Sequence, residues 1–158
     1  MKKILFMLTL GTEMLVSAAA HKVYTKNGSI SFFSTASLEN IEASNNQVMS
    51  ILNTQSGELQ FSVLIKAFHF QKALMEEHFN ENYMESNKFP KATFKGNIAE
   101  AGKVNFAADG VYPVSVSGDL TIHGVTKKVT ATGNISVRGG KINADAKFMV
   151  KLADYGVS

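Results

Sequence analysis

An alternation of apolar and polar residues runs through most of this sequence and limits the folds open to it. From Val114 to Ile122, apolar or small residues take every even position, and serine, aspartate or threonine takes every odd one. Because successive side chains of a strand point to opposite faces, this pattern predicts a strand with one buried and one solvated side. One-sided burial is typical of antiparallel sheets. The same pattern recurs, with Met149 as its exception, at residues 59–65, 92–98, 129–137 and 142–152.

Turn-forming residues separate these segments and predict a meander of about eight strands in one domain. Further strands are expected at residues 29–34, 38–43 and 47–53, and reversals at 44–46, 55–57, 108–110 and 139–140. Such a meander forms either a sandwich or a closed barrel, and closure removes the strand edges. The interior of an eight-stranded barrel is filled by side chains or holds one small ligand. Small residues on the inward phase, such as Gly118 and Gly133, favour a cavity, whereas the many phenylalanines favour a filled core.

One stretch departs from the strand period. Leu74, Met75, His78 and Phe79 fall on one face of a helix. We therefore predict one short helical insertion at about residues 72–85, which covers an end of the barrel.

The N-terminus has the features of an export signal. Two lysines at positions 2 and 3 precede an apolar run at 4–10, and Ala18, Ala19 and Ala20 supply small residues for cleavage. We predict a cleaved signal peptide at residues 1–20, a single domain at 21–158 and a periplasmic location. An uninterrupted apolar run near 20 residues is absent, so no transmembrane segment is expected. Outside the leader, 14 basic residues face 12 acidic ones, too even a balance to argue for nucleic acid.

Sequence signals for catalysis are absent. The chain has no cysteine, which removes disulfides and thiolate sites. Its histidines, at 21, 69, 78 and 123, lack a two-histidine metal spacing. Neither a nucleophile elbow nor a phosphate-binding glycine loop is present. We therefore expect no catalytic residue, no metal and no cofactor, and we expect that the protein is not an enzyme.

Two sequence blocks carry a resemblance. They read Lys-Phe-Pro-Lys-Ala-Thr-Phe at 88–94 and Gly-Asp-Leu-Thr-Ile-His-Gly-Val-Thr-Lys at 118–127. With them, the chain resembles the YceI-like, polyisoprenoid-binding protein family from about residue 28 to 155. The Ile-Ser-Phe-Phe-Ser segment at 30–34 is similar to versions from Bacteroidetes-type bacteria. The resemblance implies an exported, lipocalin-like antiparallel barrel with a helical insertion, whose apolar tunnel takes a long isoprenoid chain.

Strand phase and helix face, combined with this resemblance, predict the lining of the tunnel. At its mouth, His78 or Tyr83 could hydrogen-bond a polar head of the ligand, although a His78 that is satisfied by backbone is the other interpretation. The apolar lining is predicted to comprise Phe32, Phe61, Ile65, Phe68, Phe70, Leu74, Met75, Phe79, Phe94, Leu120 and Phe148.

The resemblance also predicts an incomplete barrel. Family members usually continue past an Asp-Tyr-Gly region, matched here at 154–156, into a final strand, whereas this sequence stops at Ser158. We expect either a C-terminally truncated sequence or a barrel without its last strand, for which a strand-exchanged dimer is one outcome.

Three functions follow from the sequence. The first is a periplasmic carrier for an isoprenoid-like or other long-chain apolar lipid. The second is a non-catalytic envelope stress or interaction module with a self-filled barrel. The third is an enzyme that acts on a lipid in the same tunnel through His78, Tyr83 or His69.

Overall fold

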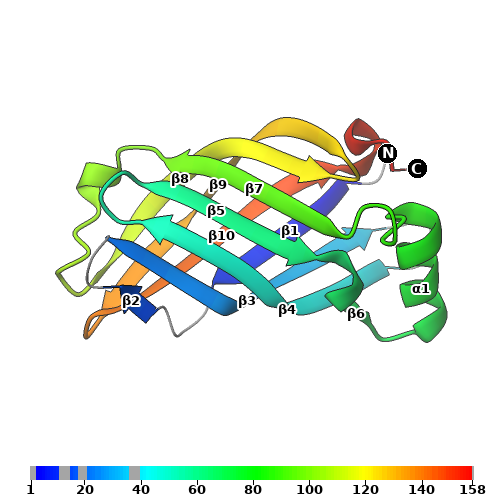
Figure 1. Cartoon of the computed structure of the whole chain (residues 1–158), viewed down its shortest axis with the longest axis horizontal. Coiled ribbons are helices and arrows are strands. Elements are labelled where there is room, and N and C mark those ends of the chain that lie inside the picture. Colours follow the sequence, from blue (N-terminus) through cyan, green and yellow to red (C-terminus); the bar gives the residue numbers. More distant parts are fainter. Residues whose placement is uncertain (1–2, 11–14, 18–20, 36–39, 158) are drawn as a thin grey trace.

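Eight antiparallel strands close into a barrel in the computed structural model, which describes residues 3–10, 15–17, 21–35 and 40–157 (Figure 1). The order around the ring is β3-β1-β10-β9-β8-β7-β5-β4, and β4 pairs back onto β3. Short strands β2 (Leu15–Ser17) and β6 (His69–Phe70) extend the sheet beside β3 and β4. The strands of the ring are β1 (Lys3–Leu10), β3 (Lys22–Thr35), β4 (Asn40–Asn53), β5 (Glu58–Leu64), β7 (Lys91–Ile98), β8 (Gly110–Ile122), β9 (Val125–Arg138) and β10 (Lys141–Lys151).

The alternation predicted antiparallel β-structure as a sandwich or a barrel, and the family resemblance implied a lipocalin-like barrel; the all-β antiparallel barrel is confirmed. Exposure and burial alternate at every residue of β7. In β10 the inward phase continues through Phe148 and Val150, while Met149 points outward. Met149 therefore breaks the alternation of residue types, because it is apolar, but not the alternation of inward and outward positions along β10.

The reversal predicted at residues 44–46 is wrong, because β4 runs through them without a break. The Asn45 side chain is fully buried: its Nδ2 donates to the carbonyl oxygen of Leu64 at 2.8 Å, and its Oδ1 accepts from the N–H of Gln47 at 2.8 Å. The register between β3 and β4 shifts opposite this point, between Gly28 and Ile30. These contacts let the strand bulge instead of turning. Of the strand predicted at 38–43, residues 38 and 39 lie outside the described residues.

The inward-phase glycines do not leave volume, contrary to the expectation from their size. A Cβ on Gly118 would lie 2.4 Å from the Cα of Gly96 on the neighbouring strand, and one on Gly133 would lie 1.8 Å from the carbonyl oxygen of Asp145. These glycines let the backbones of β7 and β8, and of β9 and β10, approach closely. The space for a ligand must therefore lie elsewhere.

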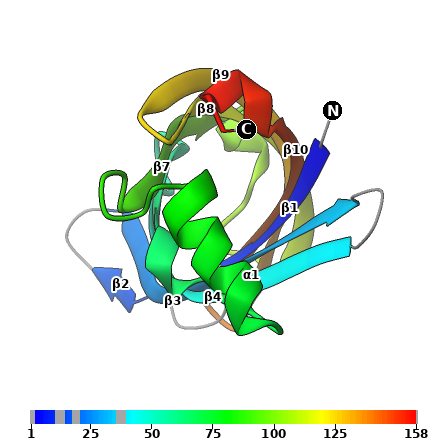
Figure 2. The same cartoon turned by 90° about the vertical axis from the view of Figure 1, so that its right-hand side faces the viewer.

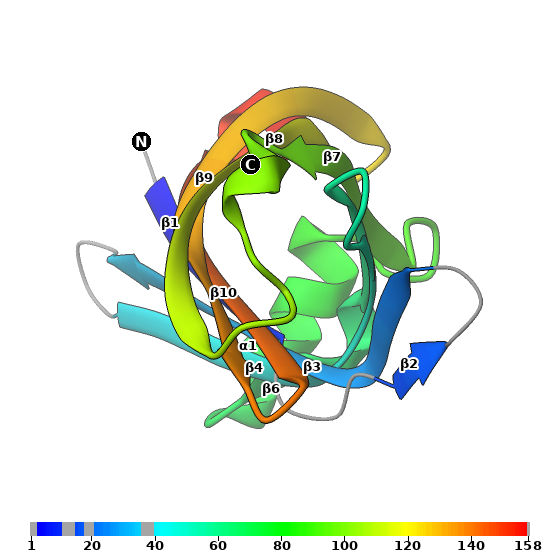
Figure 3. The ribbon, with the colours of Figure 1, turned by 90° about the vertical axis from the view of Figure 1, so that its left-hand side faces the viewer.

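Helical segments cover one end of the barrel, as predicted for residues 72–85 (Figure 2). They are α1 (Ala73–His78) and a π-helical turn, η2 (Phe79–Tyr83). At the opposite end, the segment that connects β7 to β8 crosses the opening of the barrel (Figure 3). This segment contains the 3-10 turn η3 (Ala101–Lys103). The remaining 3-10 turns are η1 (Ile65–Ala67) and η4 (Leu152–Tyr155).

The strand that closes the ring is β1, which lies in the segment predicted to be a signal peptide. It pairs with β10 at eight positions and with β3 at six. The expected gap beside β10 is thus filled in this structure. Cleavage after residue 20 stays a prediction, and Ala18–Ala20 lie outside the described residues. In the part of the chain that the structure describes, no helix is both long and apolar enough to cross a membrane.

Candidate functional site

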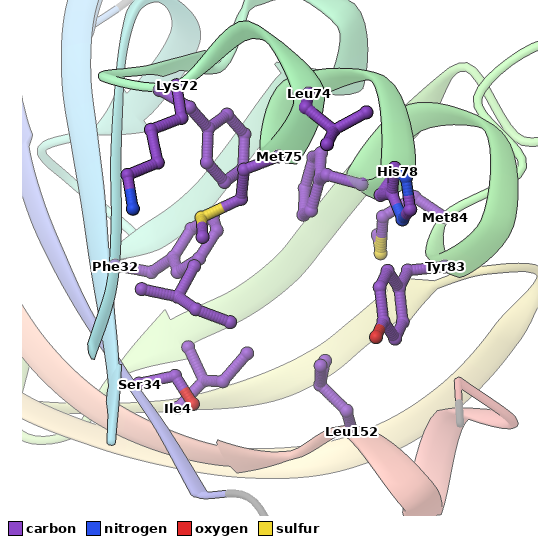
Figure 4. Close-up of a pocket in the computed structure, with 13 residues that line it drawn as sticks. Ile4, Phe32, Ser34, Lys72, Leu74, Met75, His78, Tyr83, Met84 and Leu152 are labelled. Carbon is purple, nitrogen blue, oxygen red and sulfur yellow. The ribbon is translucent and has the colours of Figure 1, made fainter. Parts of the chain in front are cut away.

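An apolar pocket of about 410 Å³ lies between the helical cap and the barrel wall (Figure 4). Its volume falls within the range of small-molecule sites. The cap contributes its helix face, and the opposite wall comes from β1, β3, β4 and η4. The lining residues are Ile4, Phe32, Ser34, Ile41, Phe70, Lys72, Leu74, Met75, His78, Phe79, Tyr83, Met84 and Leu152.

Seven of the residues predicted from the sequence meet in this pocket. The helical spacing explains four of them, because residues one, four and five apart share a face, and here that face points into the pocket. The side chain of Leu74 is 65% exposed and stands at the mouth. The seven are Phe32, Phe70, Leu74, Met75, His78, Phe79 and Tyr83.

A second, smaller pocket of about 40 Å³ lies deeper in the barrel. It shares five lining residues with the first, namely Ile4, Phe32, Phe79, Met84 and Leu152. The two pockets are therefore separated by a common wall of apolar side chains. Five more of the predicted residues line the deeper pocket but not the pocket under the cap: Phe61, Ile65, Phe68, Leu120 and Phe148.

Packed phenylalanine rings form the boundary between the two pockets. The ring centroid of Phe32 lies 5.3 Å from that of Phe68, 5.8 Å from that of Phe70 and 5.5 Å from that of Phe79. Aromatic pairs at this spacing gain energy beyond the area they bury. The centre of the barrel is thus largely filled, and the pocket under the helical cap is much larger than the one deeper in the barrel.

The predicted lining residue Phe94 borders neither pocket. Its ring is buried and stacks on Phe61 at a centroid distance of 5.0 Å. It faces inward, as its strand phase predicts, but it acts there as a packing residue beside the narrow contact of β7 with β8.

One buried hydroxyl group in the pocket has no hydrogen-bond partner. Ser34 is 2% exposed, lines the pocket, and its Oγ makes no hydrogen bond. A buried polar atom without a partner is costly, so a polar group of a ligand would gain from meeting it. In Figure 4 the amine of Lys72 extends into the pocket from the cap, and the Tyr83 hydroxyl points toward Leu152.

Sequence reasoning missed six of the lining residues. Ser34 lies two residues after Phe32 on the inward phase of β3, and that phase was the signal that could have found it. Ile4 lies in the segment predicted to be a signal peptide, outside the predicted domain at residues 21–158. The other four lie inside predicted segments, but the prediction of a strand or helix alone did not assign them to the lining. Ile41 and Leu152 fall in predicted strands, and Lys72 and Met84 fall near the two ends of the predicted helical insertion.

The end of the helical cap is fixed to the barrel by a histidine contact. Nε2 of His123 lies 2.6 Å from Oε2 of Glu85, and its Nδ1 lies 3.3 Å from the carbonyl oxygen of Tyr155. The ring of Phe89 packs on His123 at a centroid distance of 4.4 Å and covers Gly124. The two sequence blocks that carry the family resemblance therefore meet in space and hold the cap against the β8–β9 hairpin.

No group of three or more histidine, aspartate or glutamate residues is placed to hold a metal ion within the described ranges. Burial, with the nearby charge of Asp154 as the smaller cause, raises the pKa of Tyr155 above its usual 10.0. Tyr155 lies in η4, beside the cap contact and outside the pocket lining.

Comparisons with known proteins agree with this geometry. The model of the YceI-like domain matches residues 13–158. The chain belongs to the YceI-like domain family. The match begins after β1, so the strand that closes the barrel lies outside the part of the chain that matches the YceI-like domain.

Solved structures share the fold of this YceI-like domain at low sequence identity. A polyisoprenoid-binding domain from Saccharophagus degradans, implicated in plant cell wall breakdown, aligns with a TM-score of 0.66 and 14% identity, over 99% of this chain and 77% of that one. The YCEI protein of Campylobacter jejuni aligns with a TM-score of 0.57 and 15% identity, over 78% of this chain and 75% of that one. No curated protein sequence matches the chain.

Proposed function

We propose that this protein binds a long-chain apolar lipid, such as an isoprenoid, in the pocket under its helical cap. The observation that carries the proposal is the apolar pocket of about 410 Å³, which shares five wall residues with the smaller pocket deeper in the barrel. Each buried methylene of a ligand contributes about 0.8 kcal/mol, so burial of a few carbons offsets part of the cost of ordering the chain. The Saccharophagus degradans relative, which is a polyisoprenoid-binding domain, adds support for an isoprenoid.

The polar groups of the pocket support a ligand with one polar end. Ser34 offers a buried hydroxyl without a partner, and His78 and Tyr83 line the same pocket. A neutral or anionic head group would accept a hydrogen bond from Ser34, while the apolar chain lies against Met75 and Leu152. Binding of this kind needs no covalent step, and we propose that the protein is a carrier, not an enzyme.

We propose further that the protein acts in the periplasm. The lysines at positions 2 and 3, the apolar run that follows and Ala18–Ala20 support export. A carrier that takes up an envelope lipid would meet its ligand there.

The second candidate is an interaction module with a self-filled barrel. The small size of the deeper pocket, about 40 Å³, favours it. This module would leave the 410 Å³ pocket without a ligand, and so the two functions differ in a measurable way.

The proposal is tested by filling the pocket with a side chain. Ser34→Phe places a ring in the pocket from a rigid strand, and Ser31→Phe makes the same change on the outer face of that strand. Binding of a fluorescent long-chain probe, and its displacement by geranylgeranyl phosphate, are measured for each variant. We expect Ser34→Phe to weaken binding by at least about ten-fold, or about 1.4 kcal/mol, and Ser31→Phe to leave it unchanged.

Two results would remove the proposal. One is a wild-type protein that binds neither the fluorescent probe nor geranylgeranyl phosphate. The other is equal binding by the two phenylalanine variants, which would place the probe outside the pocket and favour the interaction module.

A further inference from the structure

A second large hollow lies on the outer face of the barrel wall. Its volume is about 680 Å³, and among the described residues it shares no lining side chain with the pocket under the cap. The strands that form it, β3, β4, β5, β7 and β8, are consecutive neighbours in the sheet (Figure 1). We call this hollow the outer groove and define it by Met49, Ile51, Ser62, Lys91, Thr93 and Lys95.

Short hydroxyl side chains form the floor of the outer groove. Ser62 on β5, Thr93 on β7 and Thr121 on β8 lie directly opposite one another and make a row across the strands. Residues two apart on a strand point to the same face, so Lys91 and Lys95 flank Thr93 on the exposed side of β7. The groove therefore crosses the strands between two rows of longer side chains, with a lysine on each side of its floor.

The end of the outer groove that lies over β4 is apolar. Met49 lies opposite Ser62 and continues the row of the floor, and Ile51 lies opposite Tyr24 of β3. The side chains of Met49 and Ile51 are 53% and 48% exposed. Single exposed apolar residues are common on protein surfaces, but these two are neighbours in one concave site. They can therefore bury the apolar part of a ligand.

The charge of the outer groove is positive. Lys26, Lys91 and Lys95 line it, and the acidic residue among its described lining is Asp119. Asp119 forms an ion pair with Lys128 at 2.9 Å, which offsets its charge. The groove therefore complements an anion.

The barrel wall beneath the outer groove is closed. On the inner side, Phe61 and Phe94 are 7% and 6% exposed, and their rings stack at a centroid distance of 5.0 Å. Oγ of Ser50 donates to the carbonyl oxygen of Gln60 at 3.0 Å and ties β4 to β5. A ligand in the groove therefore stays outside the barrel, and its binding can be measured separately from that of the pocket under the cap.

We propose that the outer groove binds a single-chain amphiphile with an anionic head. The head lies between Lys91 and Lys95, where the Thr93 hydroxyl adds a donor, and the apolar chain lies over Met49 and Ile51. A phosphate or carboxylate head has the acceptor oxygens that these donors need. The concave shape fits one molecule better than the flat surface of a bilayer. The groove makes this selection whether or not the pocket under the cap binds a lipid.

Methionine methyl groups report the two sites separately. Met49 lines the outer groove, whereas Met75 and Met84 line the pocket under the cap. The full chain is isotopically labelled at its methionine methyl groups and followed by NMR during titration with decyl phosphate below its micelle concentration. Decyl maltoside carries the same chain on a neutral head, and inorganic phosphate carries the charge without the chain. The variant Met49→Leu assigns the Met49 signal.

Decyl phosphate should shift the Met49 signal to saturation. We expect decyl maltoside and inorganic phosphate to bind at least about ten-fold more weakly by the same signal, because each of them makes only one of the two kinds of contact.

The lysines that flank the floor are tested by substitution. Lys91→Gln combined with Lys95→Gln should weaken the Met49 response to decyl phosphate by at least about ten-fold, because two charged donors are lost. The matched control combines Lys141→Gln with Lys147→Gln, which removes two exposed lysines of β10 and should leave the Met49 response unchanged.

A Met49 signal that decyl phosphate leaves in place would overturn the inference. So would equal responses to decyl phosphate and decyl maltoside, or equal weakening by the two double variants. A Met49 response to phosphatidylglycerol vesicles alone would also overturn it, because the groove would then contact a bilayer and not hold one molecule. Shifts of Met75 and Met84 without a shift of Met49 would remove only this inference, and the reverse result would remove only the proposed pocket ligand.

Discussion

A few residues decide where the cap sits and how closely the strands pack. Glu85 and His123, the two ends of the cap contact, both adopt left-handed backbone, with φ of 46° and 52°. Residues other than glycine rarely adopt this conformation, and it persists where surrounding contacts hold it. Their 2.6 Å contact is such a restraint.

Loss of the charge at Glu85 should destabilise the protein. We predict that Glu85→Gln lowers the free energy of unfolding by about 1 kcal/mol, a modest value because the Glu85 side chain is itself 45% exposed. Urea unfolding measures the change. The control is Glu100→Gln, which breaks the exposed pair with Lys103 and should cost less than about 0.5 kcal/mol. Equal costs for the two variants would contradict a restraining role for the contact.

Tyr155 should make stability depend on alkaline pH. Burial favours the neutral phenol in the folded state, so the pKa is raised above 10.0. The stability that this group contributes is complete below pH 10 and is lost as pH rises through the folded-state pKa. Thermal unfolding of wild type and Tyr155→Phe from about pH 8 to about pH 11 should therefore show a steeper fall for the wild type. Parallel profiles would show that the tyrosine does not contribute.

At the scale of elements, the narrow contact between β7 and β8 depends on glycine. We predict that Gly118→Ala costs about 2 kcal/mol or more, because the new Cβ would meet the backbone of Gly96, which cannot move aside. Gly102→Ala is the control, since a Cβ there has open space around it, and its cost should stay within about 0.5 kcal/mol. Denaturant unfolding of the two variants gives the comparison, and similar losses would show that the close approach is not required.

The helical cap should respond to a ligand more than the strands do. None of the residues of α1 and η2 is fully buried, so the cap has little packing to stabilise it alone. A ligand in the pocket would add contacts to Met75 and Phe79. We predict that amide hydrogen exchange across residues 73–83 slows when the lipid probe binds, while exchange in β7 changes little. Slowing confined to the outer strands would place the probe elsewhere.

The strands and the cap were predictable because each shows one clear period. The two-residue period predicted β5, β7, β8, β9 and β10, and the helix face predicted which cap residues point into the pocket. Asn45 misled the prediction, because asparagine is typical of turns and this one is buried in a continuous strand. The inward-facing glycines misled the prediction of cavity volume as well. The close approach of two strands depends on both strands, and the residue pattern of one strand does not report it.

At the scale of the whole molecule, closure of the barrel was the least predictable feature. Residues 3–10 alternate too weakly to signal a strand, and their lysines and apolar run are typical of a leader. Pairing between β1 and β10 joins the two ends of the described chain, which local sequence patterns cannot report. The molecule is thus a barrel of known family with an apolar pocket under its helical cap.

The central claim is that the pocket under the cap holds a long-chain apolar lipid. The most direct measurement is native mass spectrometry, with lipid extraction, of the protein purified without detergent from the envelope of its own host. We predict one co-purified long-chain lipid per protein for the wild type and for Ser31→Phe, and its loss from Ser34→Phe. A lipid-free wild-type protein, or equal retention of the lipid by both variants, would contradict the claim.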